Sequence, residues 1–403
     1  MIADVLVIGG GPAGLMAAGT AAESGKNVIL AEKNSSLGKK LLITGKGRCN
    51  VTNDADISEF FDNIVNNSRF LYSAFYGFTN KDVMNFFESY NVPLKVERGK
   101  RVFPKSDRSY DILCALKKYC EKVSVINKKV VGLLIDNGEI IGAELENKEK
   151  IYCKSVVVAT GGLSYPKTGS TGDGYRFAKN AGHTITDLSG ALVPLVLEGK
   201  YPKMLEGLSL KNVKVTLYQN DKEIYSDFGE MLFTKDGVSG PVILSLSSYV
   251  SDGREYKLSI DLKPALSEKT LEQRIISDFN KYINKNFINS LSDLCPKKLI
   301  PVIVEMSGIS PYKKVNVITK EERKTLERLF KNMEFKIIRK GDIEDAIITA
   351  GGVNVKEINP KTMESKLVKG LHFAGEIIDV HGYTGGYNLQ IAFSTGHCAG
   401  ENC

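Results

Sequence analysis

The chain has 403 residues, of which 42% are hydrophobic and 25% charged, a composition typical of a globular protein with two or three domains. No apolar run reaches the roughly 20 residues that cross a bilayer, and Met1 leads directly into an apolar run without a basic leader, so we expect a cytoplasmic protein with no membrane partner. The 54 Lys and Arg exceed the 47 Asp and Glu by seven, and because no basic run is interleaved with aromatic residues, this excess favours a solvated surface over a nucleic-acid partner.

The beginning of the chain carries a nucleotide-binding pattern. Residues 4–8 and 28–31 are short apolar runs typical of buried strands, and the segment between them has the small and apolar residues of a helix. Gly9, Gly11 and Gly14 fit the GxGxxG spacing. In that motif the first glycine permits a tight turn, the second lets a pyrophosphate approach the backbone, and the third lets helix and strand pack closely.

Glu32 stands at the end of the second predicted strand, 18 residues after Gly14. A carboxylate at this place can accept hydrogen bonds from the hydroxyls of an adenosine ribose. In a chain with 38 glycines GxGxxG alone is weak evidence, because an ordinary glycine-rich turn can produce it. The strand, the helix and the terminal acid in the expected order turn the motif into a prediction of dinucleotide binding.

Residues 34–53 form a glycine-rich segment with four cations. A flexible basic backbone just after a phosphate site can wrap around a bound anion, and an ordinary solvated loop has the same composition. Cys49 has no histidine nearby in the sequence, so we expect it to pack against a ligand rather than act as a nucleophile. The seven cysteines contain no CxxC pair and no metal-ligand spacing, which argues against a disulfide reductase and predicts no metal site.

Strand patterns divide the rest of the chain. An apolar run at 155–159 ends in Thr160 and Gly161, where a second strand can bring its backbone against the same ligand. We predict an α/β protein with a discontinuous nucleotide-binding domain, residues 1–190 plus 345–403. Residues 191–344 are predicted to be an inserted domain, β-rich over 191–262 and 333–344 and helical over 263–332.

The end of the chain, residues 371–403, indicates which dinucleotide is bound. Residues 371–374 are predicted to form a short strand that ends at Gly375 and Glu376, followed by a helix from about Tyr387. The free amides and positive dipole at a helix start suit an electron-rich ring. A reduced flavin gains from such a partner near N1 and the C2 carbonyl, because hydride uptake places negative charge there, whereas a nicotinamide gains little. FAD is therefore the predicted cofactor.

Seven motifs, spread in order over nearly the whole chain, resemble those of one family. They are GGGPAG (9–14), EK (32–33), GKKLLITGKGRCNVTN (38–53), ATGG (159–162), GEMLFTKDGVSGP (229–241), TAGGV (349–353) and AGEIIDVHGYTGGYNLQ (374–390). The chain resembles the bacterial flavoproteins that include aminoacetone oxidases and flavin reductases of bile-acid dehydroxylation. The most specific motifs are GKGRCNVTN and TGGYNLQ, which generic FAD proteins lack.

This resemblance implies a Rossmann-like FAD-binding domain of the glutathione-reductase and succinate-dehydrogenase type, interrupted by a β-rich domain with a helical lid. It implies that the glycine turn holds the pyrophosphate, Glu32 the ribose and the backbone of Val130 the adenine. The cofactor-binding residues implied in this way are Gly11, Pro12, Ala13, Gly14, Glu32, Lys33, Lys40, Gly47, Arg48, Cys49, Asn50, Val130, Thr160, Gly161, Gly375, Glu376, Asn388 and Leu389.

We expect an oxidoreductase that binds FAD non-covalently and transfers hydride between flavin N5 and a small organic substrate, held between the flavin and the inserted domain. The chain has no second GxGxxG, so electrons come from the substrate itself or from NAD(P)H visiting the same pocket, or they leave to oxygen. His381 and Tyr165 are candidate proton carriers, because each adjoins a segment predicted to touch the flavin, and a structural hydrogen-bonding role is the alternative for both. His381 also stands where relatives are expected to carry an acidic residue.

Two other functions use the same features. A tRNA-modifying flavoenzyme would combine the FAD fold with the positive charge, and a non-catalytic module would hold FAD without being reduced. The sequence ranks both below the oxidoreductase. It leaves the substrate, the electron partner and the oligomeric state open.

Overall fold

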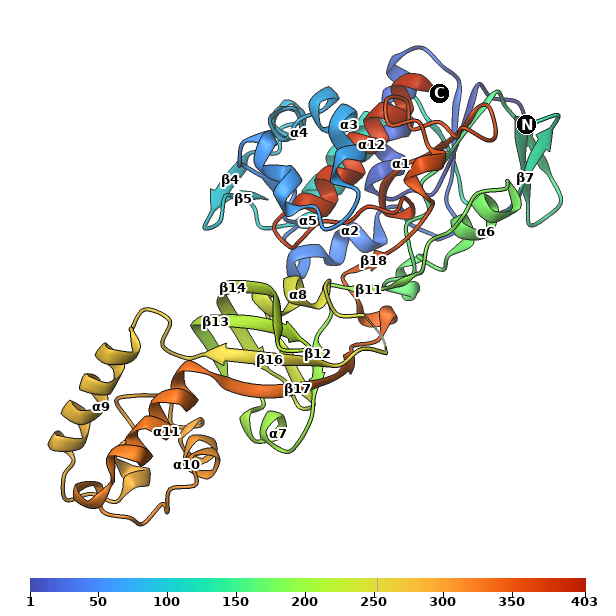
Figure 1. Cartoon of the computed structure of the whole chain (residues 1–403). Helices are drawn as coiled ribbons and strands as arrows, with labels where there is room; N and C mark the ends of the chain where they lie inside the picture. Colours follow the sequence, from blue (N-terminus) through green and yellow to red (C-terminus); the bar gives the residue numbers. More distant parts are fainter. Residues whose placement is uncertain (252) are drawn as a thin grey trace. The chain divides into compact units, whose positions relative to one another are not determined.

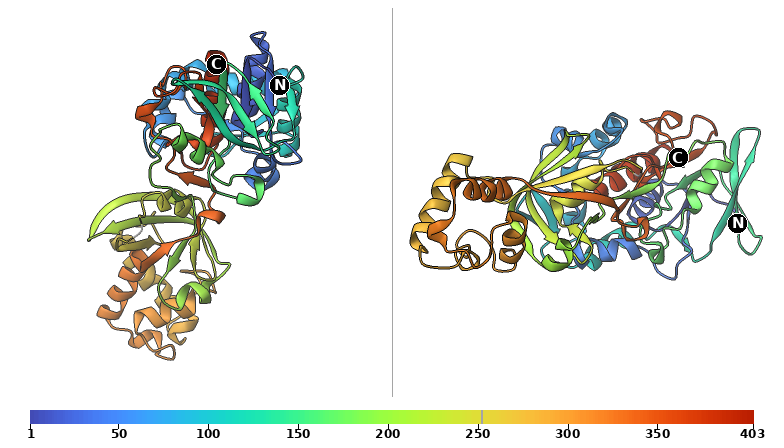
Figure 2. Two further views of the ribbon diagram at one scale, coloured as in Figure 1. Left: turned by 90° about the vertical axis from the view of Figure 1, so that its right-hand side faces the viewer. Right: turned by 60° about the horizontal axis from the view of Figure 1, so that its bottom comes forward.

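The computed structural model describes residues 1–251 and 253–403. The chain divides into two compact units, Met1–Ala191 with Ile343–Cys403 and Leu192–Asp342 (Figure 1). Each unit has a hydrophobic core of its own. Both ends of the chain lie in the first unit (Figure 2), so this unit is assembled from segments far apart in the sequence.

A five-stranded parallel sheet forms the centre of the first unit, in the order β19-β10-β1-β2-β6. The strand β1 lies in the middle, where Val5 is paired with both Val28 and Ser155. The runs VLVI and VILA are buried along their whole length, as expected of strands with both faces covered. The strands are β1 (Val5–Ile8), β2 (Val28–Ala31), β6 (Ser124–Ile126), β10 (Ser155–Val158) and β19 (Leu371–Phe373).

The helices α1 (Pro12–Glu23) and α12 (Tyr387–Asn402) are packed together through glycines. A Cβ atom at Gly396 would lie 2.4 Å from the carbonyl oxygen of Ala13, and one at Gly400 would lie 2.5 Å from that of Ala17. Both distances are too short for any side chain, so the two backbones can touch only because these residues are glycines. The contact holds the C-terminal helix against the helix of the phosphate turn.

Smaller elements complete the first unit. Strands β3, β5 and β4 form one antiparallel sheet, β7, β8 and β9 form another, and β11 is paired with β18. Their bounds and those of the remaining helices are β3 (Thr52–Asn53), β4 (Leu94–Glu97), β5 (Arg101–Pro104), β7 (Val130–Asp136), β8 (Glu139–Leu145), β9 (Lys150–Tyr152), β11 (Ser189–Ala191), β18 (Ile348–Ala350), α2 (Lys39–Ile43), α3 (Tyr72–Gly77), α4 (Asn80–Ser89), α5 (Ser109–Tyr119) and α6 (Asp173–Asn180).

The second unit is a closed antiparallel barrel with helices. Along its last strand Met333, Phe335 and Ile337 are buried and alternate with exposed residues, the period of a strand with one face on a core. The barrel order is β12-β15-β14-β13-β16-β17. The elements are β12 (Leu195–Leu197), β13 (Ser209–Gln219), β14 (Lys222–Phe233), β15 (Gly237–Ser239), β16 (Tyr256–Asp261), β17 (Met333–Lys340), α7 (Tyr201–Leu205), α8 (Pro241–Ser247), α9 (Glu268–Lys281), α10 (Ile300–Ser307) and α11 (Lys320–Lys331). In the described part of the chain no helix has the length and apolar character needed to cross a membrane.

Candidate cofactor-binding site

The turn between β1 and α1 uses its three glycines in three ways. Gly9 has a φ of +106°, and a Cβ atom there would lie 2.5 Å from the carbonyl oxygen of Ala159. A Cβ atom at Gly14 would overlap the carbonyl oxygen of Gly9 at 1.9 Å. Gly11 has no heavy atom within 4 Å of its Cβ position and borders a cavity. The start of α1 also lacks a side-chain cap, so its first amides are available to an anion in that cavity.

Glu32 directly follows β2 and is fixed by two backbone amides. The N–H of Gly10 donates to Oε2 at 2.8 Å, and the N–H of Asn34 donates to Oε1 at 2.7 Å. The residue is only 9% exposed and lines the same cavity. Each carboxylate oxygen can accept a second hydrogen bond, so Glu32 can bind two neighbouring hydroxyl groups at once.

A second acid, Asp173, lines the same cavity as Glu32. Asp173, at the start of α6, forms an ion pair of 2.7 Å with Lys33. Burial tends to raise the pKa of Asp173, but the hydrogen bonds from Lys33 and Thr171 outweigh it and lower this pKa below its usual range. The Lys33 ammonium is therefore engaged with a protein carboxylate.

Lys40 lies at the centre of a polar cluster in the cavity wall. Its ammonium donates to Oε2 of Glu376 and to Oγ of Ser164, both at 2.7 Å. The Ser164 hydroxyl and the N–H of Thr349 donate to the other oxygen of Glu376 at 2.7 and 2.9 Å. Burial tends to raise the pKa of Glu376, but Lys40, Ser164 and Thr349 together lower it, so the carboxyl group is ionised.

The start of α12 forms another part of the wall. Asn388 and Leu389 line the cavity, and Gly386 caps the helix with a φ of +101°. The Asn388 side chain accepts from the N–H of Gly382 at 2.8 Å and donates to the carbonyl of the same residue at 2.8 Å. This side chain therefore shapes the loop that precedes the helix.

Comparison with known proteins identifies the group to which this architecture belongs. A family model described as "HI0933-like protein Rossmann domain" matches residues 3–402. The chain belongs to the HI0933-like family. The 3-dehydro-bile acid delta(4,6)-reductase of Clostridium scindens is 31% identical over 409 residues, which cover 98% of this chain and 97% of that protein. The ribosomal RNA dihydrouridine synthase of Haemophilus influenzae is 32% identical over 402 residues, which cover 98% of this chain and 97% of that protein.

A solved structure shows the same fold. The open conformation of a flavocytochrome c3 fumarate reductase matches with a TM-score of 0.51 and 18% identity, covering 100% of this chain and 78% of that one. At this identity the likeness concerns the fold alone, which is the FAD-binding Rossmann fold. The family, the fold class and the enzyme class predicted from the sequence, an FAD-dependent oxidoreductase, are confirmed.

Most of the residues predicted to bind the cofactor line this one cavity of the HI0933-like protein. They come from segments at both ends of the chain, which the parallel sheet brings to one edge. Those that line the cavity are Gly11, Pro12, Ala13, Glu32, Lys33, Lys40, Val130, Thr160, Gly161, Gly375, Glu376, Asn388 and Leu389.

Five predicted residues are not among those that line the cavity: Gly14, Gly47, Arg48, Cys49 and Asn50. The Arg48 guanidinium donates hydrogen bonds to Glu97 and Asp107 rather than pointing into the cavity. It lies 4.2 Å from the centre of the Phe103 ring. Cys49 is fully buried with a φ of +61°, and burial raises the pKa of its thiol to about 12. A thiol that stays protonated at neutral pH makes a poor nucleophile, as expected for packing.

The two candidate proton carriers lie close to the cavity without lining it. The ring of Tyr165 has its centre 6.0 Å from Nζ of Lys40, and the backbone at Tyr165 has a φ of +53°. His381 is 4% exposed and follows Val380, which does line the cavity. The backbone N–H of His381 donates to Oδ1 of Asn66 at 3.3 Å, which fixes its place in the chain.

Sequence reasoning missed other residues of the wall, among them Lys128, Lys129, Asp173 and Ile348. Asp173 had a detectable signal, because it begins a helix after the glycine-containing run GSTG, as Pro12 does after GGG. Lys128 and Lys129 precede Val130, whose backbone was the only expected contact in that strand. The apolar run 346–350 predicts a short strand around Ile348, but nothing in it indicates the cavity wall. The structure pairs this strand, β18, with β11.

The donor set of the cavity fits FAD. The hydroxyl oxygen of Thr160 is buried in the wall and has no hydrogen-bond partner among the described residues, so it is available to a ligand. The open side of Gly11 leaves space for a pyrophosphate against the backbone. The two oxygens of Glu32 match a pair of ribose hydroxyls in number and in hydrogen-bonding capacity.

Proposed function

We propose that the chain is an FAD-dependent reductase that saturates a carbon–carbon double bond conjugated to a carbonyl group. The observation that carries this proposal is the single cavity in which the Gly11 turn, the Glu32 carboxylate and the start of α12 meet, since these parts suit the two ends of one flavin dinucleotide.

The names of the relatives support the type of bond. In a 3-dehydro bile acid with delta(4,6) unsaturation, the double bonds are conjugated with the carbonyl at carbon 3. Uridine becomes dihydrouridine when the ring double bond conjugated to its C4 carbonyl is saturated. Saturating one such double bond adds a hydride to the carbon β to the carbonyl, or to the δ carbon of a conjugated diene, and a proton to the neighbouring carbon of that bond. Each double bond saturated consumes two electrons. We propose NAD(P)H as the transient donor of those electrons.

The chain's own residues would bind and orient. Bound FAD supplies the hydride-transferring atom N5. The amides at the start of α1 would bind the pyrophosphate, and Glu32 would accept from the ribose hydroxyls. The Thr160 hydroxyl, unpartnered among the described residues, would donate to or accept from the cofactor. The Lys40–Glu376 cluster fixes the wall between these groups, because each of its charges is satisfied within the protein. For the proton at the α carbon, Tyr165 and His381 are the proposed carriers.

The test is an anaerobic half-reaction series with the purified protein. The flavin band should bleach with NADH or NADPH and return when cyclohexenone, a 4-en-3-one steroid or uridine-containing RNA is added. Mass spectrometry of the acceptor should show a gain of two hydrogens. A protein that retains no FAD, or whose reduced flavin is reoxidised by oxygen but by none of these acceptors, contradicts the proposal.

One observation favours uridine in RNA as the second candidate substrate. The positive excess of the chain is concentrated in residues 263–331, which hold 14 Lys and Arg against 8 Asp and Glu. A steroid substrate needs no such charge, whereas phosphates do. The acceptor series distinguishes the two substrates. If uridine in RNA is the substrate, RNA reoxidises the reduced flavin faster than the steroid does.

A further inference from the structure

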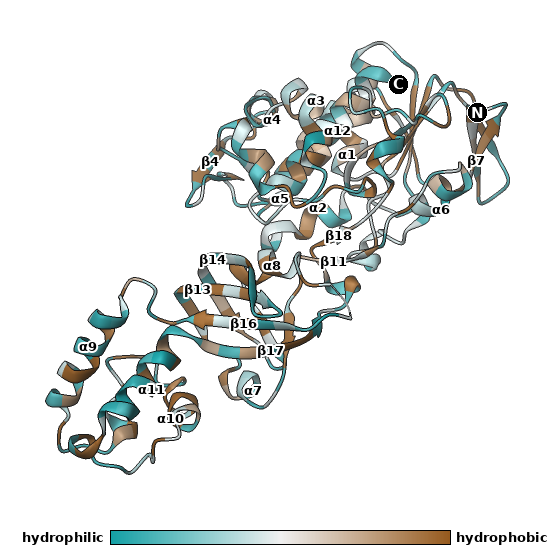
Figure 3. Ribbon diagram, viewed as in Figure 1, coloured by the Kyte–Doolittle hydropathy of each residue, from teal (hydrophilic) through white to brown (hydrophobic). Residues whose placement is uncertain are grey.

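Residues 263–331, which belong to the second unit, form a positively charged segment. Residues 263–331 are about a sixth of the chain and account for six of its seven excess positive charges. They contain α9, α10 and α11, and hydrophilic residues are prominent along α11 in Figure 3. Exposed cations of this segment are Lys269, Arg274, Lys281, Lys285, Lys297, Lys298, Lys314, Lys320, Lys324 and Arg328.

Two loops of this segment lie side by side and are called the paired loops here: 282–288 and 311–315. The N–H of Val315 donates to the carbonyl of Lys285 at 3.1 Å, and an antiparallel bridge joins the two loops one residue further along. Residues that are almost 30 positions apart in the sequence therefore share one surface.

The paired loops carry two tyrosine rings, Tyr282 and Tyr312, together with several lysines. Tyr312 is 78% exposed, the highest exposed fraction of any aromatic side chain among the described residues. The ammonium groups of Lys281 and Lys285 lie 4.9 and 4.4 Å from the centre of the Tyr282 ring, within cation–π distance. Tyr312 is followed in the sequence by Lys313 and Lys314. An exposed ring on a basic segment is an arrangement with which proteins bind unpaired nucleotides.

Carboxylates neutralise only part of this surface. Asp293 accepts from Lys281 at 2.7 Å and from the Tyr282 hydroxyl at 2.8 Å, and Glu322 accepts from Lys313 at 2.6 Å. In the described residues no carboxylate lies within ion-pair distance of Lys285 or Lys314. The Lys314 ammonium donates to the carbonyl of Asn284 at 3.2 Å, and both lysines are exposed. Both positive charges can therefore be contacted by phosphate groups from the solvent side.

We propose that the paired loops bind single-stranded RNA, with Lys285 and Lys314 contacting phosphates and Tyr312 stacking on an unpaired base. The choice of RNA among polyanions rests on the proposed function, in which uridine in RNA is the second candidate substrate. An anionic membrane would satisfy the lysines but offers no base for the Tyr312 ring, and duplex nucleic acid keeps its bases stacked inside the helix.

The test measures binding of a fluorescein-labelled U20 RNA to the FAD-loaded full chain by anisotropy over a range of salt concentrations. In the double variant Lys285→Gln/Lys314→Gln, affinity at low salt should fall about tenfold, and the salt slope should shrink by roughly 1.4, the value for two lost phosphate contacts. Tyr312→Ala should weaken binding about fivefold or more without changing the salt slope. The matched control is Lys117→Gln/Lys118→Gln, which removes the same charge from exposed positions of α5 in the first unit and should bind RNA like the wild type.

Several results would overturn the proposal: no RNA binding by the wild-type protein, equal losses in the double variant and its control, or equal affinity for duplex DNA. Far-UV circular dichroism and a thermal unfolding curve like those of the wild type show that the second unit of each variant is folded, because this unit has a core of its own. Tyr312→Ala tests the surface independently should the double variant fail to fold. RNA binding in a protein that reduces no conjugated acceptor would contradict the proposed function and leave this surface standing. Reduction of enones without RNA binding would do the reverse.

Discussion

The Thr52 hydroxyl donates a hydrogen bond of 2.6 Å to the side-chain oxygen of Gln390, a residue 338 positions later in the chain. Gln390 is fully buried in the first turn of α12, and its amide group donates to the carbonyl of Phe78 at 3.0 Å. Thr52 does not line the cavity, but the helix start that it holds does. It is a positioning residue of the cofactor site.

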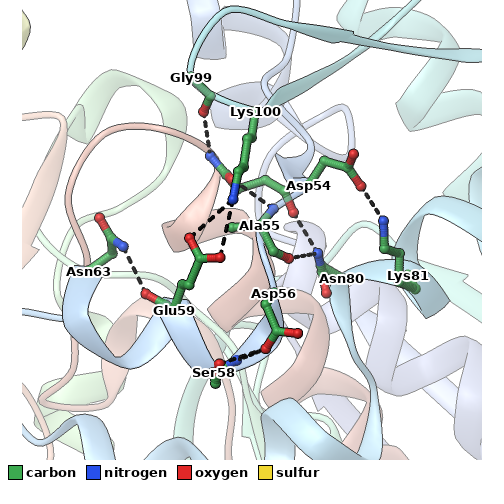
Figure 4. A network of polar contacts seen from close by, with 11 residues as sticks. Asp54, Ala55, Asp56, Ser58, Glu59, Asn63, Asn80, Lys81, Gly99 and Lys100 are labelled. Carbon is green, nitrogen blue, oxygen red and sulfur yellow. Dashed lines mark hydrogen bonds and ion pairs between the residues drawn. The ribbon is translucent and has the colours of Figure 1, made fainter.

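Asn53, the next residue, holds the loop before the same helix. Its side-chain amide donates to the carbonyls of Gly385 and Gly99, both at 3.0 Å. Its backbone carbonyl accepts from the side chain of Asn80 at 2.7 Å, and Asn80 also donates to the carbonyl of Ala55 at 2.8 Å (Figure 4). Thr52 and Asn53 of the motif GKGRCNVTN therefore hold Gln390 and Gly385 of the motif TGGYNLQ in place by hydrogen bonds.

We expect Thr52→Val to weaken FAD binding and to lower the free energy of unfolding by about 1–3 kcal/mol, because Gln390 then has a buried oxygen without a donor. Urea unfolding and FAD titration measure the two effects. Thr52→Ser keeps the hydroxyl and should stay close to the wild type. A valine variant with unchanged FAD affinity would show that the bond does not position α12.

Gly11 and Gly14 should respond differently to alanine. Gly11→Ala meets no neighbouring atom, so the FAD-free protein should lose no more than about 1 kcal/mol of stability, while the new methyl group enters the phosphate space and weakens FAD binding at least tenfold or so. Gly14→Ala should destabilise the fold itself, because its Cβ overlaps the carbonyl oxygen of Gly9. Thermal unfolding without FAD, followed by FAD titration, distinguishes the two. Similar melting temperatures for both variants would contradict this assignment.

Glu32→Gln should reduce FAD affinity by about tenfold or more. The amide NH2 group cannot accept from Gly10 or Asn34, so one buried N–H loses its partner and one ribose hydroxyl loses an acceptor. Isothermal titration with FAD measures the change. Glu146→Gln, an exposed change of the same type in the first unit, serves as the control and should bind FAD normally.

Removal of Lys40 should make stability depend on pH in a new way. In the wild type, burial tends to raise the pKa of Glu376, but Lys40 and the hydrogen bonds lower it, so this carboxylate stabilises the fold above the usual carboxyl range near about 4.3 and loses that contribution as pH falls further. In Lys40→Met burial dominates and raises that pKa. The stability deficit of the variant should then be largest at neutral pH, about 3–5 kcal/mol, and should shrink toward pH 4 as Glu376 takes up a proton.

Urea unfolding at a series of pH values measures this deficit. Lys40→Arg keeps the positive charge and should retain most of the wild-type profile. A deficit in Lys40→Met that is equal at all pH values would mean that the Lys40 side chain acts through packing alone.

Cysteine reactivity should separate Cys114 from the other thiols. All seven cysteines are free, and Cys114 is exposed whereas the others are buried. Burial also raises the pKa of the Cys49 thiol to about 12, so little thiolate forms at neutral pH. Native protein should release about one equivalent of thionitrobenzoate rapidly from Ellman's reagent, and Cys114→Ser should abolish that phase. Rapid modification of Cys49 would assign it a reactive role instead.

The phosphate turn is the part of the site that could be predicted most closely from the sequence. The strands expected at 4–8 and 28–31 are Val5–Ile8 and Val28–Ala31, and Glu32 follows the second. The prediction was possible because a strand pattern, the positive φ of Gly9 and the contact of Gly14 with Gly9 all depend on residues close together in the sequence. The barrel closure and the helix α8 had no comparable local signal, since closure depends on which strands pair.

The sequence by itself determined a dinucleotide turn, the acid that follows it and a family whose members share the fold. Only the tertiary structure decided that Lys40 meets Glu376, that Thr52 holds Gln390, that Arg48 turns to Glu97, and that Lys285 lies beside Val315. The periodicity of a segment reports which of its faces is buried, but it carries no information on the distant segment packed against that face. Partners hundreds of residues apart are selected by the packing of the whole unit.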